Sequence, residues 1–264
     1  MRVVVGILII GVVVAGIVVL YDVGKKASSD SIIPKQALSE AKRAEIRSAL
    51  QDLSDAEKSA RGVVRRFGKD ATPVIIERVQ EIYEKGSDWE YQRLYAQAED
   101  LIVSLGEAGD ARAKDALELW VADKDYRVFR DEAAQALGKL GDRSSRQALW
   151  QAWNEEKGYL LEGDDEGPWP FAGEPPAGGY VHSMLADIGK ALHELGDDEV
   201  IGELIEVGSL SEGRWEAGKM KIIDALSDIS GKALEPEMLG MKYWEKWWQD
   251  NQASYLDNKQ EPVQ

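Results

Sequence analysis

The sequence predicts an all-helical chain in which stacked helical hairpins follow one transmembrane helix. Three observations support this fold class. Apolar residues recur at the helical period through most of the chain, a motif ending in Gly-Asp is repeated, and an uncharged apolar run stands near the N-terminus. We expect the hairpins to stack as an α-solenoid, in which each unit packs mainly against its neighbours.

The composition is that of a chain able to bury a hydrophobic core. Its 264 residues are 44% hydrophobic and 30% charged. The absence of cysteine excludes a disulfide framework, a thiolate zinc site and a cysteine nucleophile. The net charge of −16 argues against nucleic acid as a partner, because affinity for phosphates depends largely on Lys and Arg. We therefore expect no nucleic-acid partner.

The first predicted element is a membrane anchor over residues 1–24. Residues 3–20 are all Val, Ile, Leu, Ala or Gly, and as a helix they would extend roughly 27 Å, close to the width of a bilayer core. A cleaved signal peptide is the alternative. Its apolar region is usually shorter, and no clean Ala-x-Ala site follows here. The prediction is a single-pass membrane protein that contacts the bilayer through residues 3–20.

The orientation of this anchor stays open. Lys25 and Lys26 outnumber Arg2, which favours a cytoplasmic C-terminal domain, whereas a very short N-terminal tail also suits the opposite orientation. Residues 25–38 are small and polar and contain Pro34, so they are expected to form a linker.

The next elements are repeated helical hairpins. A motif that begins with Leu and ends with Gly-Asp occurs three times, and a degenerate fourth copy follows. The leading leucines are Leu105, Leu137, Leu192 and Leu226. In the first three copies the glycine stands where a helix C-terminus favours positive φ, and the aspartate stands where the next helix needs an N-cap. These pairs are Gly109 and Asp110, Gly141 and Asp142, and Gly196 and Asp197.

The second copy carries a family resemblance. Residues 131–142 (DEAAQALGKLGD) are similar to the helix-turn core of the short HEAT-like repeats, including those first described in phycobilisome lyases. The resemblance covers residues 93–156 well and 182–230 more loosely. It implies an α-solenoid of HEAT-like hairpins over residues 39–251, with long exposed surfaces suited to binding, and it does not imply catalysis.

Two departures from this pattern lie in the C-terminal copies. His193 stands where the earlier copies have Gly106 and Gly138, and the fourth copy lacks its Gly-Asp pair. We interpret both as signs of different packing near the C-terminus, such as a cap.

The long interval between the second and third copies indicates an inserted loop. Residues 158–180 match the excess length, contain no Lys or Arg, and hold four of the eight prolines. Aromatic residues on such a loop either dock into the protein's own groove or contact a ligand. The candidate partner-binding residues of this loop are Asp164, Asp165, Glu166, Trp169 and Phe171.

A tryptophan-rich helix is expected after the last repeat. Trp244, Trp247 and Trp248 have i, i+3, i+4 spacing, which places them on one helix face. They either cap the end of the solenoid or anchor a protein partner, since tryptophan is enriched at interface hot spots. Residues 252–264 are expected to form a polar tail.

The sequence offers little for catalysis or metal binding. His182 and His193, the two histidines, are eleven residues apart, or roughly 16 Å on one helix, which is too far for one metal ion. No known catalytic or phosphate-binding motif is present. We therefore expect no catalytic residues, no metal and no cofactor.

The function expected from the sequence is a membrane-tethered, non-catalytic scaffold or adaptor that binds a protein, with a basic partner suiting the acidic charge. A lyase-like or maturation factor is the alternative by analogy with the bilin lyases, and it would require a polar pocket near the histidines. A purely structural envelope spacer is the third possibility.

Overall fold

The computed structural model describes residues 38–51, 59–85, 92–163, 179–211 and 215–256, and every regular element within these ranges is helical. This confirms the all-helical part of the predicted fold class. The α-helices are α2 (Glu40–Gln51), α3 (Ala60–Phe67), α4 (Thr72–Lys85), α5 (Gln92–Ala108), α6 (Lys114–Ala122), α7 (Arg130–Leu140), α8 (Arg146–Glu162), α9 (Tyr180–Glu194), α10 (Glu199–Leu210), α11 (Glu216–Ser230) and α12 (Met241–Leu256). Short 3₁₀ turns precede several of them, including η5 (Lys124–Phe129) and η7 (Pro236–Leu239).

The transmembrane part of the predicted fold class is not supported. None of the helices in the described ranges is both long and apolar enough to span a bilayer. Most of these helices keep a polar stripe along one side, because only one face contributes to the core. The apolar run at residues 3–20 lies outside the described residues, and so do residues 25–37 of the expected linker.

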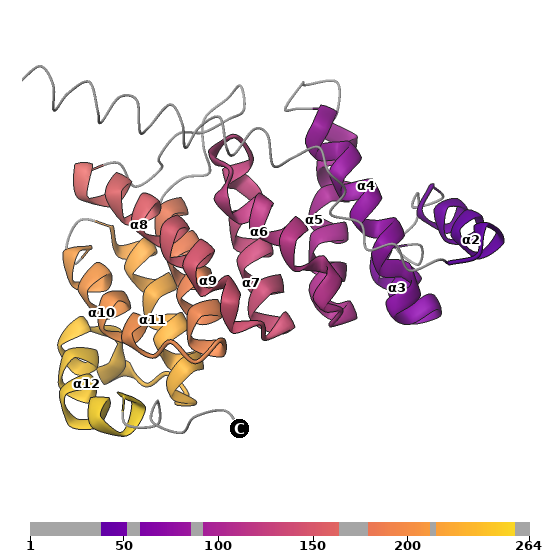
Figure 1. Ribbon diagram of the computed structural model, residues 1–264. Helices are drawn as coiled ribbons and strands as arrows, with labels where there is room; N and C mark the ends of the chain where they lie inside the picture. Colours follow the sequence, from indigo (N-terminus) through magenta and orange to yellow (C-terminus); the bar gives the residue numbers. More distant parts are fainter. Residues whose placement is uncertain (1–37, 52–58, 86–91, 164–178, 212–214, 257–264) are drawn as a thin grey trace, which may run out of the picture. The chain divides into compact units, whose positions relative to one another are not determined.

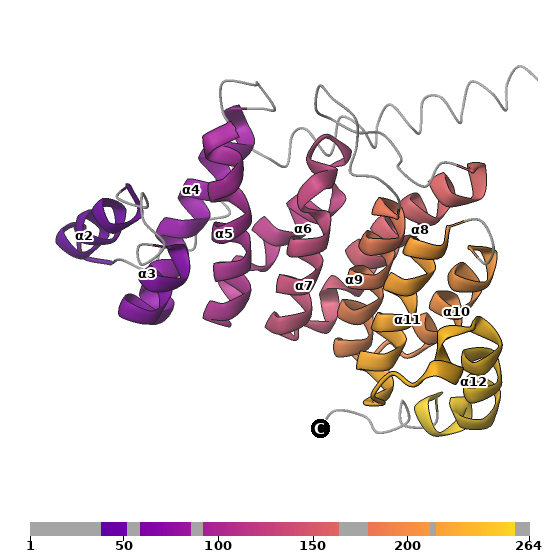
Figure 2. The same cartoon turned by 180° about the vertical axis from the view of Figure 1, so that it is seen from behind.

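Two layers of helices build the core. In the first layer, α5 contacts α7, α7 contacts α9, and α9 contacts α11. The second layer consists of α4, α6, α8 and α10, each packed against a helix of the first layer. Both views in Figures 1 and 2 show this alternation along the chain. The helix α2 contacts α3 and α4, and α12 contacts α10.

The turns between paired helices repeat one backbone geometry. A glycine with positive φ ends the first helix of each pair, and these are Gly68, Gly109, Gly141, Gly196 and Gly231. The predicted N-caps at Asp110 and Asp142 are confirmed, because their side chains accept hydrogen bonds from the backbone N–H groups two residues later. In the turn of the third copy, α10 begins after Asp198, and the Asp197 carboxylate accepts a 2.8 Å hydrogen bond from Trp150 Nε1.

The other repeated glycine lets neighbouring helices of the first layer approach closely. A Cβ atom on Gly106 would lie 2.7 Å from the Cα of Ala136, and one on Gly138 would lie 3.1 Å from the Cα of Ala191. Ala136 and Ala191 each precede the leading leucine of the next copy. Gly106 and Gly138 are therefore the contact points between α5 and α7 and between α7 and α9.

The Gly106→Ala substitution is expected to lower the free energy of unfolding by about 1–3 kcal/mol, because α7 must move away from the new methyl group. The control is Gly158→Ala in α8, where a Cβ atom meets nothing within 4 Å. That change should raise stability by about 0.5–1 kcal/mol, since alanine favours the helix. Urea denaturation of both variants measures the difference. Equal shifts would show that Gly106 is not a packing contact.

The insertion is shorter than the sequence predicts. Helix α8 continues to Glu162, Gly163 ends it in the left-handed conformation, and α9 begins at Tyr180. Leu160 is buried and Tyr159 packs against the core, so residues 158–162 extend the buried stripe of α8 rather than forming a loop.

The polar tail also begins later than predicted, because α12 runs to Leu256. The Tyr255 ring contacts the rings of Trp247 and Trp248 at 5.7 and 5.9 Å between centroids. This aromatic contact stabilises the helical conformation of residues 252–256.

Candidate functional site

The C-terminal tryptophans lie mostly in the core. Trp244 has no exposed surface and Trp247 is 9% exposed, whereas Trp248 is half-buried. The Nε1 of Trp244 donates a 2.8 Å hydrogen bond to the carbonyl oxygen of Met238. The buried position of Trp244 and Trp247 agrees with a cap, and it leaves these two side chains little surface for a partner.

The loop residues proposed for partner binding, Asp164, Asp165, Glu166, Trp169 and Phe171, lie outside the described residues. Their role stays a prediction.

The two histidines occupy different environments. His182 has no exposed surface, and its Nε2 is hydrogen bonded to the Ser211 hydroxyl, which itself donates to the carbonyl oxygen of Val207 at 2.8 Å. His193 is half-buried, with its Nδ1 2.6 Å from an Asp198 carboxylate oxygen. Because His182 is sealed among helices, it has no surface from which to act on a substrate. No group of three His, Asp or Glu side chains within the described ranges could hold a metal ion.

His193 also accounts for the change in the repeat at that position. Its ring lies 6.3 Å from that of Tyr255 in α12. The residue that replaces the repeated glycine thus contacts the C-terminal helix.

A buried ionic network joins η5, α7 and α8, and the sequence analysis missed it. Arg127, Arg130 and Glu156 have no exposed side-chain surface. Arg127 donates two hydrogen bonds from Nε to the Glu156 carboxylate, at 2.8 and 3.0 Å, and Arg130 also donates to this carboxylate. Arg130 Nε donates to the carbonyl oxygen of Val121 at 2.8 Å. Fully paired buried charges of this kind are structural, because separating them would leave charge in the core.

Aromatic rings and a second carboxylate complete this network. The Arg127 guanidinium lies 5.1 Å from the ring centroids of both Tyr159 and Tyr180. Arg130 Nη2 donates to Glu155 at 3.2 Å. Tyr180 is the first residue of α9, so its contact with Arg127 positions the start of α9.

Polar side chains form a continuous surface across the first layer, which we call the acidic layer face. We define it by nine residues that share the non-core side of α5, α7, α9 and α11. They are Glu99, Asp131, Glu132, Gln135, Asp187, Lys190, Lys221, Asp224 and Asp228. Six of these are carboxylates and two are lysines. All nine are half-buried or exposed.

Interactions between helices hold the acidic layer face together. The Gln135 side chain of α7 is hydrogen bonded to Asp187 of α9. Lys190 of α9 pairs with Asp228 of α11, with 2.9 Å between Nζ and Oδ2. Asp224 lies one helical turn from both Lys221 and Asp228.

Two carboxyl groups of this face have raised pKa values. Burial, followed by the hydrogen bond and negative charge of Asp131, raises the pKa of Glu132 well above its ordinary range. Burial and the Asp131 charge raise the pKa of Asp187 to about 6, although Lys190 and Lys221 oppose this. The Glu132 Oε2 atom is buried without a hydrogen-bond partner. Glu132 therefore keeps its proton at pH 7, and the charge of Asp131 adds to the effect of burial on both groups, a repulsion that a bound cation would relieve.

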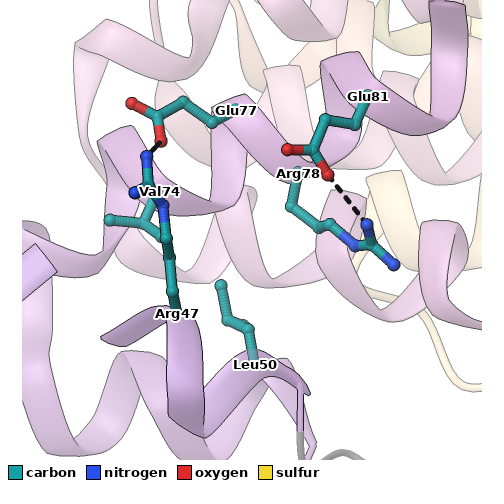
Figure 3. Close-up of a pocket in the computed structure, with 6 residues that line it drawn as sticks. All are labelled: Arg47, Leu50, Val74, Glu77, Arg78 and Glu81. Carbon is teal, nitrogen blue, oxygen red and sulfur yellow. Dashed lines mark hydrogen bonds and ion pairs between the residues drawn. The ribbon is translucent and has the colours of Figure 1, made fainter. Parts of the chain in front are cut away.

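A small hollow of about 160 Å³ lies between α2 and α4. Leu50 and Val74 contribute apolar surface to it. Figure 3 shows that its arginines are already paired, Arg47 with Glu77 and Arg78 with Glu81, each at 2.8 Å. The hollow is smaller than typical ligand pockets, and its charged side chains are paired, so it is a weaker candidate than the acidic layer face.

Comparisons of the chain with protein-family models, with curated proteins and with solved structures found no match. The resemblance to HEAT-like repeats therefore stays a prediction.

Proposed function

We propose that this chain is a non-catalytic protein-binding scaffold of HEAT-like helical pairs, and that its acidic layer face binds a basic segment of another protein. The observation that carries this proposal is the clustering of acidic side chains on that face, with five carboxylates and the protonated Glu132 against two lysines. Burial is the main cause of the raised pKa values of Glu132 and Asp187, and the repulsion by Asp131 that adds to it is what Lys or Arg side chains of a partner would relieve.

The construction of the face also supports a binding role. It is built on four helices of one layer, in which close contacts at Gly106 and Gly138 join α5, α7 and α9, and α11 packs against α9. A rigid, extended and charged surface suits an extended peptide better than it suits a small substrate, because no enclosed pocket is needed.

The direct test uses a fluorescently labelled Lys-Gly repeat peptide and the full-length chain, with binding measured by anisotropy. Asp228→Lys should weaken binding about fivefold, because it reverses one charge of the face. The matched control is Asp250→Lys in α12. Both aspartates pair with one lysine, and their side chains are similarly exposed, at 63% and 59%.

The control variant should change the affinity less than twofold, since only the net charge changes there. Equal weakening by the two variants would mean that the peptide responds to the overall charge of the chain. Unchanged affinity in Asp228→Lys, or no peptide binding, would reject the acidic layer face as a binding surface and favour a structural spacer.

Peptide binding should also depend on pH. Because the raised pKa keeps much of Asp187 protonated at pH 5, the cation must displace a proton there, whereas at pH 7 the carboxylate is already ionised. We expect affinity to fall about tenfold from pH 7 to pH 5 if binding returns the pKa of Asp187 to its ordinary value. Asp187→Asn should reduce this pH dependence of the affinity. If the dependence is unchanged in that variant, groups other than Asp187 cause it. Isothermal titration calorimetry at both pH values provides the measurement.

A further inference from the structure

The turns that end α3, α5 and α7 lie next to one another along one edge of the layers. Arg112 Nη2, in the turn after α5, donates a 2.8 Å hydrogen bond to the carbonyl oxygen of Lys69 in the turn after α3. Lys114 is close enough to Asp142, in the turn after α7, to interact with its charge. These contacts set three turns side by side, as Figure 1 shows at the lower ends of the helices.

Unpaired cations gather on this edge. We define the basic turn edge by five residues that come from the turns after α3 and α7 and from the adjoining helix ends, whereas the cations of the turn after α5, Arg112 and Lys114, are paired with carboxylates. They are Arg65, Lys69, Lys139, Arg143 and Arg146. All are exposed except Arg146, which is half-buried. None of the five forms an ion pair with a carboxylate of the described residues, and the one hydrogen bond of Arg146 goes to the carbonyl oxygen of Arg143.

The carboxylates of the same turns are already engaged. Asp70 pairs with Lys42, and Asp110 pairs with Arg112. Asp142 accepts hydrogen bonds from the backbone N–H and the hydroxyl of Ser144, at 2.9 and 2.7 Å. The local charge of the edge is therefore positive, although the chain as a whole carries −16.

We propose that the basic turn edge is a second interaction surface, which binds an extended acidic segment of a protein. Charge complementarity selects the partner, because Asp and Glu carboxylates would pair with guanidinium and ammonium groups that have no carboxylate partner among the described residues. Arg65 and Lys69 lie at the turn after α3, and Lys139, Arg143 and Arg146 lie at the turn after α7, so an extended segment that crosses the turn after α5 meets both groups.

Single-stranded nucleic acid fits this edge less well. Proteins that bind it combine cations with aromatic side chains on which bases stack. The aromatic residue of these three turns is Phe67, which packs against the core with the Arg66 guanidinium over its ring, 4.7 Å from the centroid. The dense phosphates of a nucleic acid would also be repelled by the chain's overall negative charge.

This edge uses other side chains than the acidic layer face, although Lys139 lies one helical turn after Gln135 on α7. A scaffold with an acidic face and a basic edge would bring two partners of opposite charge together. The proposal does not depend on the proposed function, because each surface has its own probe and its own variant.

The experiment measures binding of a labelled Glu-Gly repeat peptide to the full-length chain, with a single-stranded oligonucleotide as the competing probe. The edge variant combines Lys69→Glu with Arg143→Glu. The control combines Lys124→Glu with Lys246→Glu, which changes the net charge equally at exposed lysines away from the edge. Circular dichroism checks that both variants stay helical.

We expect the edge variant to bind the acidic peptide at least about fivefold more weakly and the control less than twofold more weakly. Asp228→Lys should not weaken this binding, which separates the result from that of the acidic layer face. Equal losses of peptide affinity in the two double variants would overturn the proposal, and so would a lack of peptide binding by the unmodified chain. The proposal would also be overturned if the unmodified chain bound the oligonucleotide more tightly than the peptide and the edge variant lost that binding.

Discussion

Replacing Glu156 by alanine is expected to lower the free energy of unfolding by about 3–5 kcal/mol. Glu156 is the carboxylate shared by Arg127 and Arg130, and all three side chains are fully buried. Its removal leaves two guanidinium groups in the core, and Arg130 keeps its contact with Glu155. Such uncompensated charge is far more costly than the loss of a surface ion pair. Equilibrium denaturation in urea measures the effect.

Two further variants separate charge burial from simple loss of contacts. Glu155→Ala should cost about 1 kcal/mol, because Glu155 is 31% exposed and makes one long contact with Arg130. Replacing Arg127 and Arg130 by methionine together with Glu156→Leu should restore most of the stability lost in Glu156→Ala, since no buried charge then remains. A loss below about 1 kcal/mol in Glu156→Ala would show that the arginines readily reach solvent or another carboxylate.

Replacing Trp244 by alanine should cost about 3–5 kcal/mol, the usual range for a fully buried tryptophan. Its ring packs edge-on against Trp247 at 5.6 Å and Tyr243 at 5.3 Å, and its indole N–H bonds to Met238. The stability should decrease most where α12 packs against α10, because the stability of a stacked helical pair depends mainly on its neighbours.

Hydrogen exchange combined with denaturation tests this second prediction. Faster exchange is expected in α10, α11 and α12, with little change in α4 and α5. The half-buried Trp248 serves as the control, and Trp248→Ala should cost about 1–2 kcal/mol. A Trp244→Ala variant as stable as the Trp248→Ala variant would show that Trp244 does not anchor a cap.

The turns between helices were the most predictable part of the fold. Their geometry depends on local chemistry, namely a glycine with positive φ and an aspartate that caps the next helix, and both are visible in a few neighbouring residues. The Asp197 carboxylate also accepts the indole hydrogen bond of Trp150, which lies 47 residues earlier. That contact joins distant residues and could not be predicted from the local sequence.

The buried ionic network left a signal that the sequence analysis did not use. Arg130 stands three and seven residues before Ala133 and Leu137, and Glu156 stands four residues before Leu160. These positions belong to the apolar stripes of their helices, so the register predicts burial for both. Opposite charges at core positions of neighbouring helices indicate that they pair. That partnership could have been proposed from the helical periodicity alone.

The acidic layer face could not be found in this way. Its residues come from four helices spread over more than a hundred residues of sequence, and each helix contributes only a few of them. In an acidic chain, carboxylates on a helix surface are usually solvated and carry little information. The packing order of α5, α7, α9 and α11 is what brings these carboxylates together.

The most direct test of the central claim is photo-crosslinking of a Lys-Gly repeat peptide to the full-length chain, followed by mapping of the modified residues. The acidic layer face predicts cross-links on α7, α9 and α11 around Asp131, Asp187 and Asp224, and their yield should fall in Asp228→Lys but not in Asp250→Lys. Cross-links concentrated on α12, or spread evenly and unaffected by Asp228→Lys, would contradict a basic segment bound at this face.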